Sequence, residues 1–271
     1  MRRRFLIFGA HPDDCDILFG GTALKLIPLG AEVFFVSLTN GNAGHQTMTR
    51  EALAERRFTE TQNSAKTAGL IEYRVLGHDD GTLMPTLENR LEMIRIIREI
   101  NPDAVFTHRL CDYHPDHRAA SQLMNDASFL AAVPLVCPEN PIPEDFNPIY
   151  GYLADDFNDP SSFKPEAAVL TDDQIERKID MLACQESQFF EWLPWCNRQR
   201  DFDPSAMNEA ERRDHIYRGW IMRDMKRANR WREFLDNVYG DAGHQARHAE
   251  FFALMPVRGG QSVERLRELL G

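Results

Sequence analysis

The chain has 271 residues, of which 43% are hydrophobic and 27% charged, as in an ordinary globular protein large enough for a well-buried core. Its formal net charge of −11 argues against a nucleic-acid partner, and no apolar stretch is long enough to cross a membrane. The five cysteines are odd in number and lack CxxC spacing, so we expect reduced thiols in a cytoplasmic protein.

Strands and helices are predicted to alternate over the first half of the chain. The apolar runs predict strands at residues 5–9, 32–39, 73–76 and 104–107. Helical patterns and their stop signals predict helices at 13–27, 50–68, 87–100 and 118–129. This order is typical of an α/β fold with a doubly wound, mostly parallel sheet and helices on both faces.

After residue 133 the chain becomes rich in proline, and we expect extended loops with short strands near 148–154 and 167–170. Thr171 is a plausible N-cap for a helix that runs to about residue 188. A long helical pattern covers 206–237, and a tail is expected over 240–260. The simplest organisation is a single domain, 1–271, with a core at 1–132 and an elaboration at 133–271.

Two segments of similar pattern follow the first and the fourth predicted strands. They read His11-Pro12-Asp13-Asp14 and His114-Pro115-Asp116-His117. Proline at the first helical position places residues i and i+3 on one side of the opening turn. Three N or O ligands with an open position are typical of catalytic zinc, so we predict His11, Asp14 and His117 as ligands, with water in the fourth place. Fe²⁺, Co²⁺ and Mn²⁺ are alternatives for such a site.

The other polar residues of the two segments are available for chemistry. A carboxylate beside the metal but free of it suits a general base, and we assign this role to Asp13. His114 is expected to stabilise the oxyanion and to donate a proton to the leaving amine. Asp116 is predicted to orient His114, as carboxylate–histidine pairs do.

A single His-Pro-Asp at a helix start is most often an ordinary cap, but two such turns at one sheet edge favour a site. Asp112 and His108 are either residues that support the ligands of the site or simple loop caps, and we favour loop caps. His45 and His78 are expected to be solvated histidines on loops. No role is assigned to the remaining histidines outside these segments, His215, His244 and His248.

The two motifs, extended to residues 10–14 and 112–117, resemble those of the PIG-L/LmbE-like zinc deacetylases. These are Rossmann-like enzymes that hydrolyse N-acetyl groups, typically from N-acetylglucosamine-containing conjugates. The resemblance runs from about Arg3 to Leu130, with later echoes at 178–188 and 250–251. It implies the same zinc ligands, Asp13 as the base, His114 as the assisting group, and a C-terminal part that covers the site and sets substrate choice.

The resemblance also implies that Arg57 and Asp80 contact the substrate. Taken alone, Arg57 would be interpreted as part of a surface helix pair with Glu60, and Asp80 as a turn residue. The chain departs from the family at Cys15, where glutamate is common, and at Asp112, where some members have tyrosine. Cys15 is interpreted as a buried structural thiol without a catalytic role.

We therefore predict a zinc-dependent hydrolase that removes an N-acetyl group from a small N-acetylglucosamine-type conjugate. The alternatives are a non-catalytic metal- or carbohydrate-binding protein on the same scaffold, and an amidase of a thiol–sugar conjugate. A phosphoesterase is disfavoured because such sites usually hold two metals, and a nicotinamide dehydrogenase because the first turn lacks GxGxxG.

The sequence is compatible with a homo-oligomer. The basic segment 212–232, with Trp220 and Trp231, is either an anionic-substrate handle or subunit contact, or simply an exposed helix whose aromatics face the core.

Overall fold

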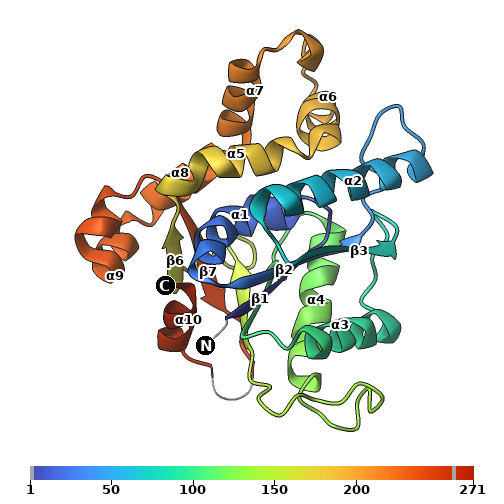
Figure 1. Cartoon of the computed structure of the whole chain (residues 1–271), viewed down its shortest axis with the longest axis vertical. Coiled ribbons are helices and arrows are strands. Elements are labelled where there is room, and N and C mark those ends of the chain that lie inside the picture. The colour runs from blue at the N-terminus through green and yellow to red at the C-terminus, as the bar shows by residue number, and fades with distance from the viewer. Residues whose placement is uncertain (1–2, 258–260) are drawn as a thin grey trace.

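The computed structural model describes residues 3–257 and 261–271. Within these residues a single seven-stranded sheet has the order β3-β2-β1-β4-β5-β7-β6 (Figure 1). The strands β1 to β5 are parallel, and β7 runs antiparallel to both of its neighbours. The bounds are β1 (Arg4–Gly9), β2 (Glu32–Thr39), β3 (Glu72–His78), β4 (Ala104–Thr107), β5 (Ile149–Leu153), β6 (Ala167–Leu170) and β7 (Ala249–Leu254). The predicted α/β class with a doubly wound, mostly parallel sheet is confirmed.

Helices cover both faces of this sheet because its central strands are apolar on both sides. In β1, Leu6 and Phe8 belong to one buried cluster, and Phe5 and Ile7 belong to the other. The first cluster packs under α3 (Leu87–Ile100) and α4 (Pro115–Leu130), and the second under α1 (Asp14–Leu26), α2 (Arg50–Ala68) and α10 (Val263–Leu270) (Figure 1).

The helices of the first half begin and end at the residues that their capping signals indicate. The side chains of Thr49 and Thr86 accept backbone hydrogen bonds at the starts of α2 and α3. Gly69 ends α2 with a positive φ of 81°, a conformation that glycine adopts without strain. The four strands and four helices predicted for this half are therefore present, with small shifts of their bounds.

The helices of the second half are shorter than predicted. Thr171 makes no side-chain cap, and a 3₁₀ turn (Asp172–Gln174) precedes α5 (Ile175–Ala183). A π-helical turn (Ser187–Trp192) and α6 (Leu193–Cys196) follow. The pattern expected over 206–237 is divided into α7 (Glu209–Ile216), a second π turn (Tyr217–Ile221), α8 (Met222–Arg230) and α9 (Arg232–Gln245).

Burial of apolar side chains explains this second π turn. Ile216, Trp220 and Ile221 all enter one cluster with Phe189 and Phe190, and the rings of Phe189 and Trp220 lie 4.2 Å apart. A regular helix would turn one of these side chains away from the cluster, whereas the wider turn buries them together.

Two further short 3₁₀ turns lie at Ile27–Leu29 and Pro204–Ala206.

The prediction of an irregular tail over 240–260 was wrong. Its residues Ala249–Leu254 form β7 between β5 and β6, and Phe251 and Phe252 are buried on opposite faces of the sheet. Residues 258–260 of that prediction lie outside the described part. The sequence analysis also missed α10, which buries Leu266 and Leu270.

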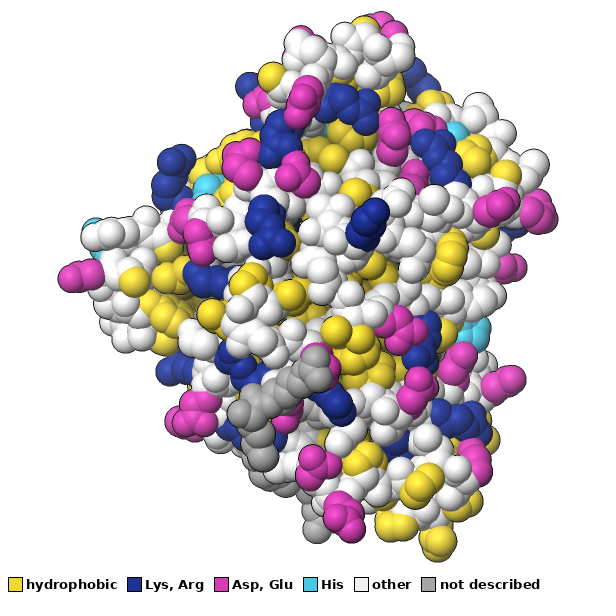
Figure 2. All heavy atoms as spheres, in the orientation of Figure 1, with side chains coloured by type: hydrophobic (Ala, Val, Ile, Leu, Met, Phe, Trp, Pro, Cys, Tyr) yellow, Lys and Arg dark blue, Asp and Glu magenta, His cyan; other side chains and the backbone are white. Residues whose placement is uncertain are grey.

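The surface and the thiols agree with the composition. Acidic and basic side chains intermingle on the face drawn in Figure 2. Among the helices described, none combines the length and the apolar character needed to span a bilayer.

All five cysteines are free thiols, and Cys15 is fully buried with its Sγ 3.5 Å from the carbonyl oxygen of Ile7. This placement agrees with the predicted structural role of Cys15.

Candidate metal centre and active site

The two histidine-containing motifs meet beyond the carboxyl ends of two neighbouring strands. His11 lies two residues after β1, and His114 is the N-cap of α4, in the segment that follows β4. Since β1 pairs with β4, the segments that leave these strands start side by side. The strand order reverses between β1 and β4, which is the position where doubly wound folds bind their ligands.

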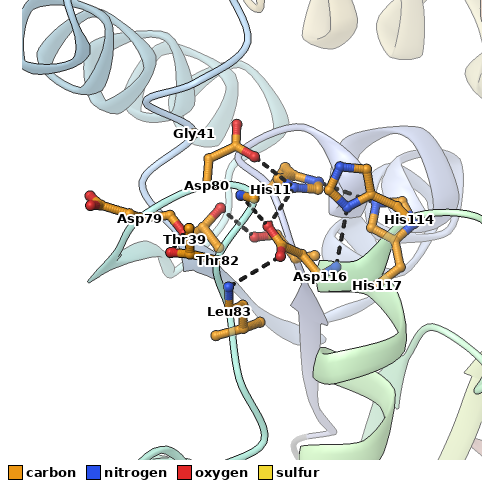
Figure 3. A network of polar contacts seen from close by, with 12 residues as sticks. His11, Thr39, Gly41, Asp79, Asp80, Thr82, Leu83, His114, Asp116 and His117 are labelled. Carbon is orange, nitrogen blue, oxygen red and sulfur yellow. Dashed lines mark hydrogen bonds and ion pairs between the residues drawn. The ribbon is translucent and has the colours of Figure 1, made fainter.

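His11 uses its two ring nitrogens in different directions. Its Nδ1 lies 3.2 Å from Nε2 of His117 and 3.5 Å from Oδ2 of Asp14. Its Nε2 lies 3.3 Å from Oδ1 of Asp80 and 3.3 Å from Oδ2 of Asp116 (Figure 3). Two carboxylates therefore support the side of the ring that faces away from Asp14 and His117.

His117 repeats this arrangement. Its Nε2 faces His11 and lies 3.5 Å from Oδ1 of Asp14, while its Nδ1 lies 3.0 Å from Oδ2 of Asp112. Asp112 also accepts a 2.8 Å hydrogen bond from the backbone N–H of His114. The ring of His108 stacks on that of His117, with centroids 4.1 Å apart.

The donor atoms of His11, Asp14 and His117 fit a tetrahedral metal ion. Nδ1 of His11 lies 3.2 Å from Nε2 of His117, and each of these two nitrogens lies 3.5 Å from a carboxylate oxygen of Asp14, Oδ2 for His11 and Oδ1 for His117. Zinc bonds to nitrogen and oxygen of about 2.0–2.2 Å give tetrahedral edges of about 3.3–3.6 Å. The three predicted ligands are therefore brought together at metal-binding spacing.

Other side chains in the cluster also approach one another closely enough to share an ion. These groups are His11 with His114 and His117, Asp14 with His108 and His117, and His11 with Asp80 and Asp116. Several of their atoms already have partners, however. Nδ1 of His114 accepts from the backbone N–H of Asp116, and Nε2 of His108 accepts from that of Ala10, both at 3.2 Å.

Asp13 lies beside this centre and contacts Arg57. Nη2 of Arg57 is 3.0 Å from Oδ2 of Asp13, and the Arg57 side chain is only 2% exposed. Gly41 makes room for the guanidinium, because a Cβ at this position would overlap it, and its φ is +66°. Burial raises the pKa of Asp13, and the charge of Arg57 opposes this rise.

Three predictions about neighbouring residues need correction. The Asp116 carboxylate supports His11 rather than His114, because it accepts hydrogen bonds from the backbone N–H groups of Gly81 (2.7 Å) and Leu83 (3.2 Å), and these direct it toward His11. Arg57 is not a surface partner of Glu60, which pairs instead with Arg56 at 3.1 Å.

The third correction concerns residues that were not expected to take part in the site. Asp112 and His108 are not mere loop caps, since they contact His117 and Asp14 respectively. His45 is not solvated, because its side chain is 3% exposed and lies 2.8 Å from Glu191. The spacing of Asp112 two residues before His114 is that of an Asx turn, and this signal would have identified a fixed Asp112 side chain.

One cavity of about 590 Å³ contains the cluster and extends away from it. Near the candidate metal site it is lined by the residues described above, including Asp13, Arg57, Asp80 and His114. Its other walls come from the second half of the chain, at residues 153–157 and at Gln188, Trp192, Leu193, Cys196, Trp220, Arg223 and Arg227. Its volume is typical of a small-molecule site.

Solved structures with this fold include two enzymes of different reaction types. The N,N'-diacetylchitobiose deacetylase from Pyrococcus horikoshii aligns with a TM-score of 0.70 at 24% identity and covers 94% of this chain and 84% of its own. GalB, the 4-carboxy-2-hydroxymuconate hydratase from Pseudomonas putida KT2440, aligns with a TM-score of 0.67 at 17% identity, covering 96% and 99%. These likenesses establish the fold alone.

Sequence relatives are more informative. The PIG-L family, described as GlcNAc-PI de-N-acetylase, matches residues 6–128, which include both motifs. A 1D-myo-inositol 2-acetamido-2-deoxy-alpha-D-glucopyranoside deacetylase from Catenulispora acidiphila is 32% identical over 55% of each chain. The diacetylchitobiose deacetylase from Thermococcus kodakarensis is 31% identical over 204 residues, which cover 71% of this chain and 73% of the relative. Identity at this level over more than two thirds of both proteins, with a family match that spans both motifs, shows that the chain belongs to the PIG-L family.

Proposed function

We propose that the chain is a metal-dependent hydrolase that removes the N-acetyl group from an N-acetylglucosamine-type conjugate. The observation that carries this proposal is the convergence of His11, Asp14 and His117 at metal-binding spacing, with the Asp13 carboxylate beside them. The relatives support it, since their names describe deacetylases of diacetylchitobiose and of an inositol-linked acetamido sugar.

His11, Asp14 and His117 are the proposed ligands. Their facing donor atoms support this choice, since Nδ1 of His11 and Nε2 of His117 lie 3.2 Å apart and each is 3.5 Å from an oxygen of Asp14. Zinc is the proposed ion, with Fe²⁺, Co²⁺ and Mn²⁺ as alternatives for a mixed N and O site. Such an ion would supply a Lewis acid for the amide carbonyl and lower the pKa of water.

Asp13 is the proposed general base. Its carboxylate would take the proton of the attacking water, and Arg57 holds it in place. A carboxylate with a raised pKa is a stronger base than one in open water, and burial has this effect on Asp13. Arg57 and Asp80 line the cavity, which supports the substrate contacts predicted for both.

His114 is the proposed hydrogen-bond donor to the oxyanion. Burial, and then the charges of His11 and His117, lower its pKa and favour the neutral ring. Since Nδ1 accepts from the backbone N–H of Asp116, the neutral ring carries its proton on Nε2. This tautomer is able to donate a hydrogen bond to a developing oxyanion, while the proton that the leaving amine needs would be the one that Asp13 takes from the attacking water. Asp116 acts indirectly in this scheme, through His11.

The second half of the chain is proposed to cover the site and to select the substrate, as one domain with the core. The cavity walls contributed by residues 153–157, Trp192 and Trp220 support this division of roles. A reducing compartment such as the cytoplasm is the proposed location, which the five free thiols support.

The test is a deacetylation screen of N-acetylglucosamine conjugates on protein of known metal content. Asp13→Asn should retain the metal and lose at least about 100-fold in kcat, since general bases contribute about 10²–10⁴-fold. His11→Ala should lose metal and activity together, because it removes a ligand. The readouts are metal analysis and amine release.

Asp241→Asn is the matched control, because Asp241 is an exposed carboxylate on α9 away from the cavity. It should leave both readouts unchanged. Near-normal turnover in Asp13→Asn would refute the base assignment. A metal-loaded wild-type protein that is inert towards every conjugate would favour the non-catalytic alternative.

A further inference from the structure

One wall of the cavity, formed by α8 and the segments that follow β4 and β5, carries arginines and carboxylates side by side. The arginines that line this wall are Arg109, Arg223 and Arg227, and the carboxylates are Asp155 and Asp156. Tyr113 joins this wall to the metal centre, since its ring contacts those of His114 on one side and Phe157 on the other, at 5.7 and 5.8 Å.

The carboxylates on this wall are already paired. Asp155 binds Arg109 through both oxygens, at 2.5 and 2.7 Å. Asp156 accepts from Arg227 at 2.9 Å and from Arg230, outside the cavity, at 2.7 Å. Neither carboxylate is therefore left to neutralise a further cation.

Arg223 is the cation without such a partner. Within the described residues its guanidinium makes no hydrogen bond or ion pair, although it lines the cavity. Its side chain is exposed to solvent, and although the surrounding protein and the charge of Arg227 lower its pKa, the charges of Asp156 and Asp224 oppose this shift. One turn along the same face, Arg227 is only 8% exposed, and its buried Nε also lacks a hydrogen-bond partner. The buried Nε of Arg227 is an unpaired donor of the kind that is unfavourable in a protein interior, whereas the exposed guanidinium of Arg223 is accessible to a ligand in the cavity.

The start of α8 is fixed rather than free to move. Asp224, next to Arg223, forms a 2.6 Å ion pair with the fully buried Lys178. Lys178 in turn binds Glu250 on β7 at 2.6 Å and donates to the carbonyl oxygen of Ile17 on α1 at 2.9 Å. The helix therefore presents Arg223 from a rigid support, which lowers the entropy cost of binding a ligand there.

We propose that Arg223 and Arg227 form a subsite for an anionic group, a carboxylate or a phosphate, carried by the substituent attached to the amino sugar. This inference rests on the proposed deacetylase function and deepens it. It also gives the basic segment 212–232 a role, the anionic-substrate handle. An arginine pair with free N–H donors binds carboxylate and phosphate oxygens through charge-assisted hydrogen bonds.

The test compares two N-acetylglucosamine glycosides of nearly equal shape, the carboxymethyl and the carbamoylmethyl glycoside, which differ in charge. The wild-type protein should show a kcat/KM at least about tenfold higher for the carboxymethyl glycoside, mainly through KM, as expected for one charge-assisted contact. N-Acetylglucosamine 1-phosphate tests phosphate as the source of the charge.

Arg223→Gln should reduce the ratio of the two kcat/KM values to about one, and Arg223→Lys should keep part of the preference. Lys226→Gln removes the same charge from an exposed position of α8 that does not line the cavity, so it should leave the ratio unchanged. A ratio near one in the wild-type protein would overturn the inference, as would an equal loss on both glycosides in Arg223→Gln.

Binding separates this inference from the proposed function. If metal-loaded wild-type protein hydrolyses neither these two glycosides nor any conjugate of the screen, the deacetylase proposal fails. Calorimetric titration with the same two glycosides then tests the subsite by itself. Tighter binding of the carboxymethyl glycoside that is lost in Arg223→Gln supports the subsite. Equal binding, or no binding of either glycoside, contradicts it.

Discussion

Each of the two histidines proposed as ligands is held by carboxylates on the side opposite to the metal. Asp80 and Asp116 support His11, and Asp112 supports His117. Such contacts fix the ring orientation and the tautomer, and they make the ligand nitrogen more basic. The carboxylates around the centre are thus divided between the proposed ligand Asp14, the proposed base and the supports of the rings.

Asp112 offers the clearest test of this arrangement, because its other hydrogen bond is to backbone and an asparagine is able to retain it. Asp112→Asn should weaken metal affinity by about 10–100-fold, as is usual for the loss of an outer carboxylate. Competition with a chromophoric chelator measures the change. Asp145→Asn, at an exposed carboxylate that bonds Asn101, should leave the affinity unaltered. An unchanged affinity in Asp112→Asn would show that His117 needs no such support.

At the scale of single residues, the sequence pointed to those site residues that belong to a recognisable local motif. His11, Asp14 and His117 follow from two similar turns, whose spacing is local. The partners of these residues depend on contacts between distant segments. Asp116 reaches His11 because the loop after β3 supplies N–H groups at Gly81 and Leu83, and no local pattern encodes that contact.

At the scale of elements, predictions were sound where an amphipathic or apolar period ran uninterrupted between capping residues. The first four strands have this property, and so do α2 and α3. In the second half, tertiary packing overrides local preference. The π turn Tyr217–Ile221 forms around Trp220, and β7 is a strand because the sheet buries both Phe251 and Phe252.

The buried ion-pair cluster of Lys178, Asp224 and Glu250 joins α5, α8 and β7. Glu250 also accepts hydrogen bonds from the backbone N–H groups of Gly21 and Thr22 in α1, both at 2.8 Å. Lys178→Met should therefore lower the free energy of unfolding by about 3–5 kcal/mol, since it leaves two carboxylates buried without their cation. Urea unfolding with metal-free protein provides the measurement.

A second variant separates charge from packing in this cluster. Adding Asp224→Leu to Lys178→Met should restore part of the lost stability, because one unpaired buried charge is removed. Lys25→Met is the matched control, since Lys25 pairs with the exposed Asp173 and should cost under about 1 kcal/mol. If the double variant is less stable than Lys178→Met alone, side-chain packing and not charge determines the stability of this cluster.

At the scale of the whole molecule, the site depends on one topological fact. The order β3-β2-β1-β4-β5 makes β1 and β4 neighbours, although β1 starts at Arg4 and β4 at Ala104. The crossovers between parallel strands are right-handed by rule. The sequence analysis anticipated this meeting, because parallel strands expose their carboxyl ends at one edge. The second half was also expected to cover the site, but the residues that line the cavity were not predicted, because its loops and π turns carry no comparable periodic signal.

Since the proposed metal would join the segment after β1 to the start of α4, its binding should stabilise the folded protein as a whole. At a free zinc concentration about 100-fold above Kd, linkage gives about 2.7 kcal/mol of stabilisation. A domain of this size gains roughly 2–4 °C in Tm per kcal/mol, so the expected rise is about 5–10 °C. Scanning calorimetry of chelator-treated protein with added Zn²⁺ measures it. The rise should vanish in His11→Ala and be absent with Mg²⁺, which prefers oxygen ligands. An equal rise in His11→Ala would mean that the stabilising ion binds elsewhere.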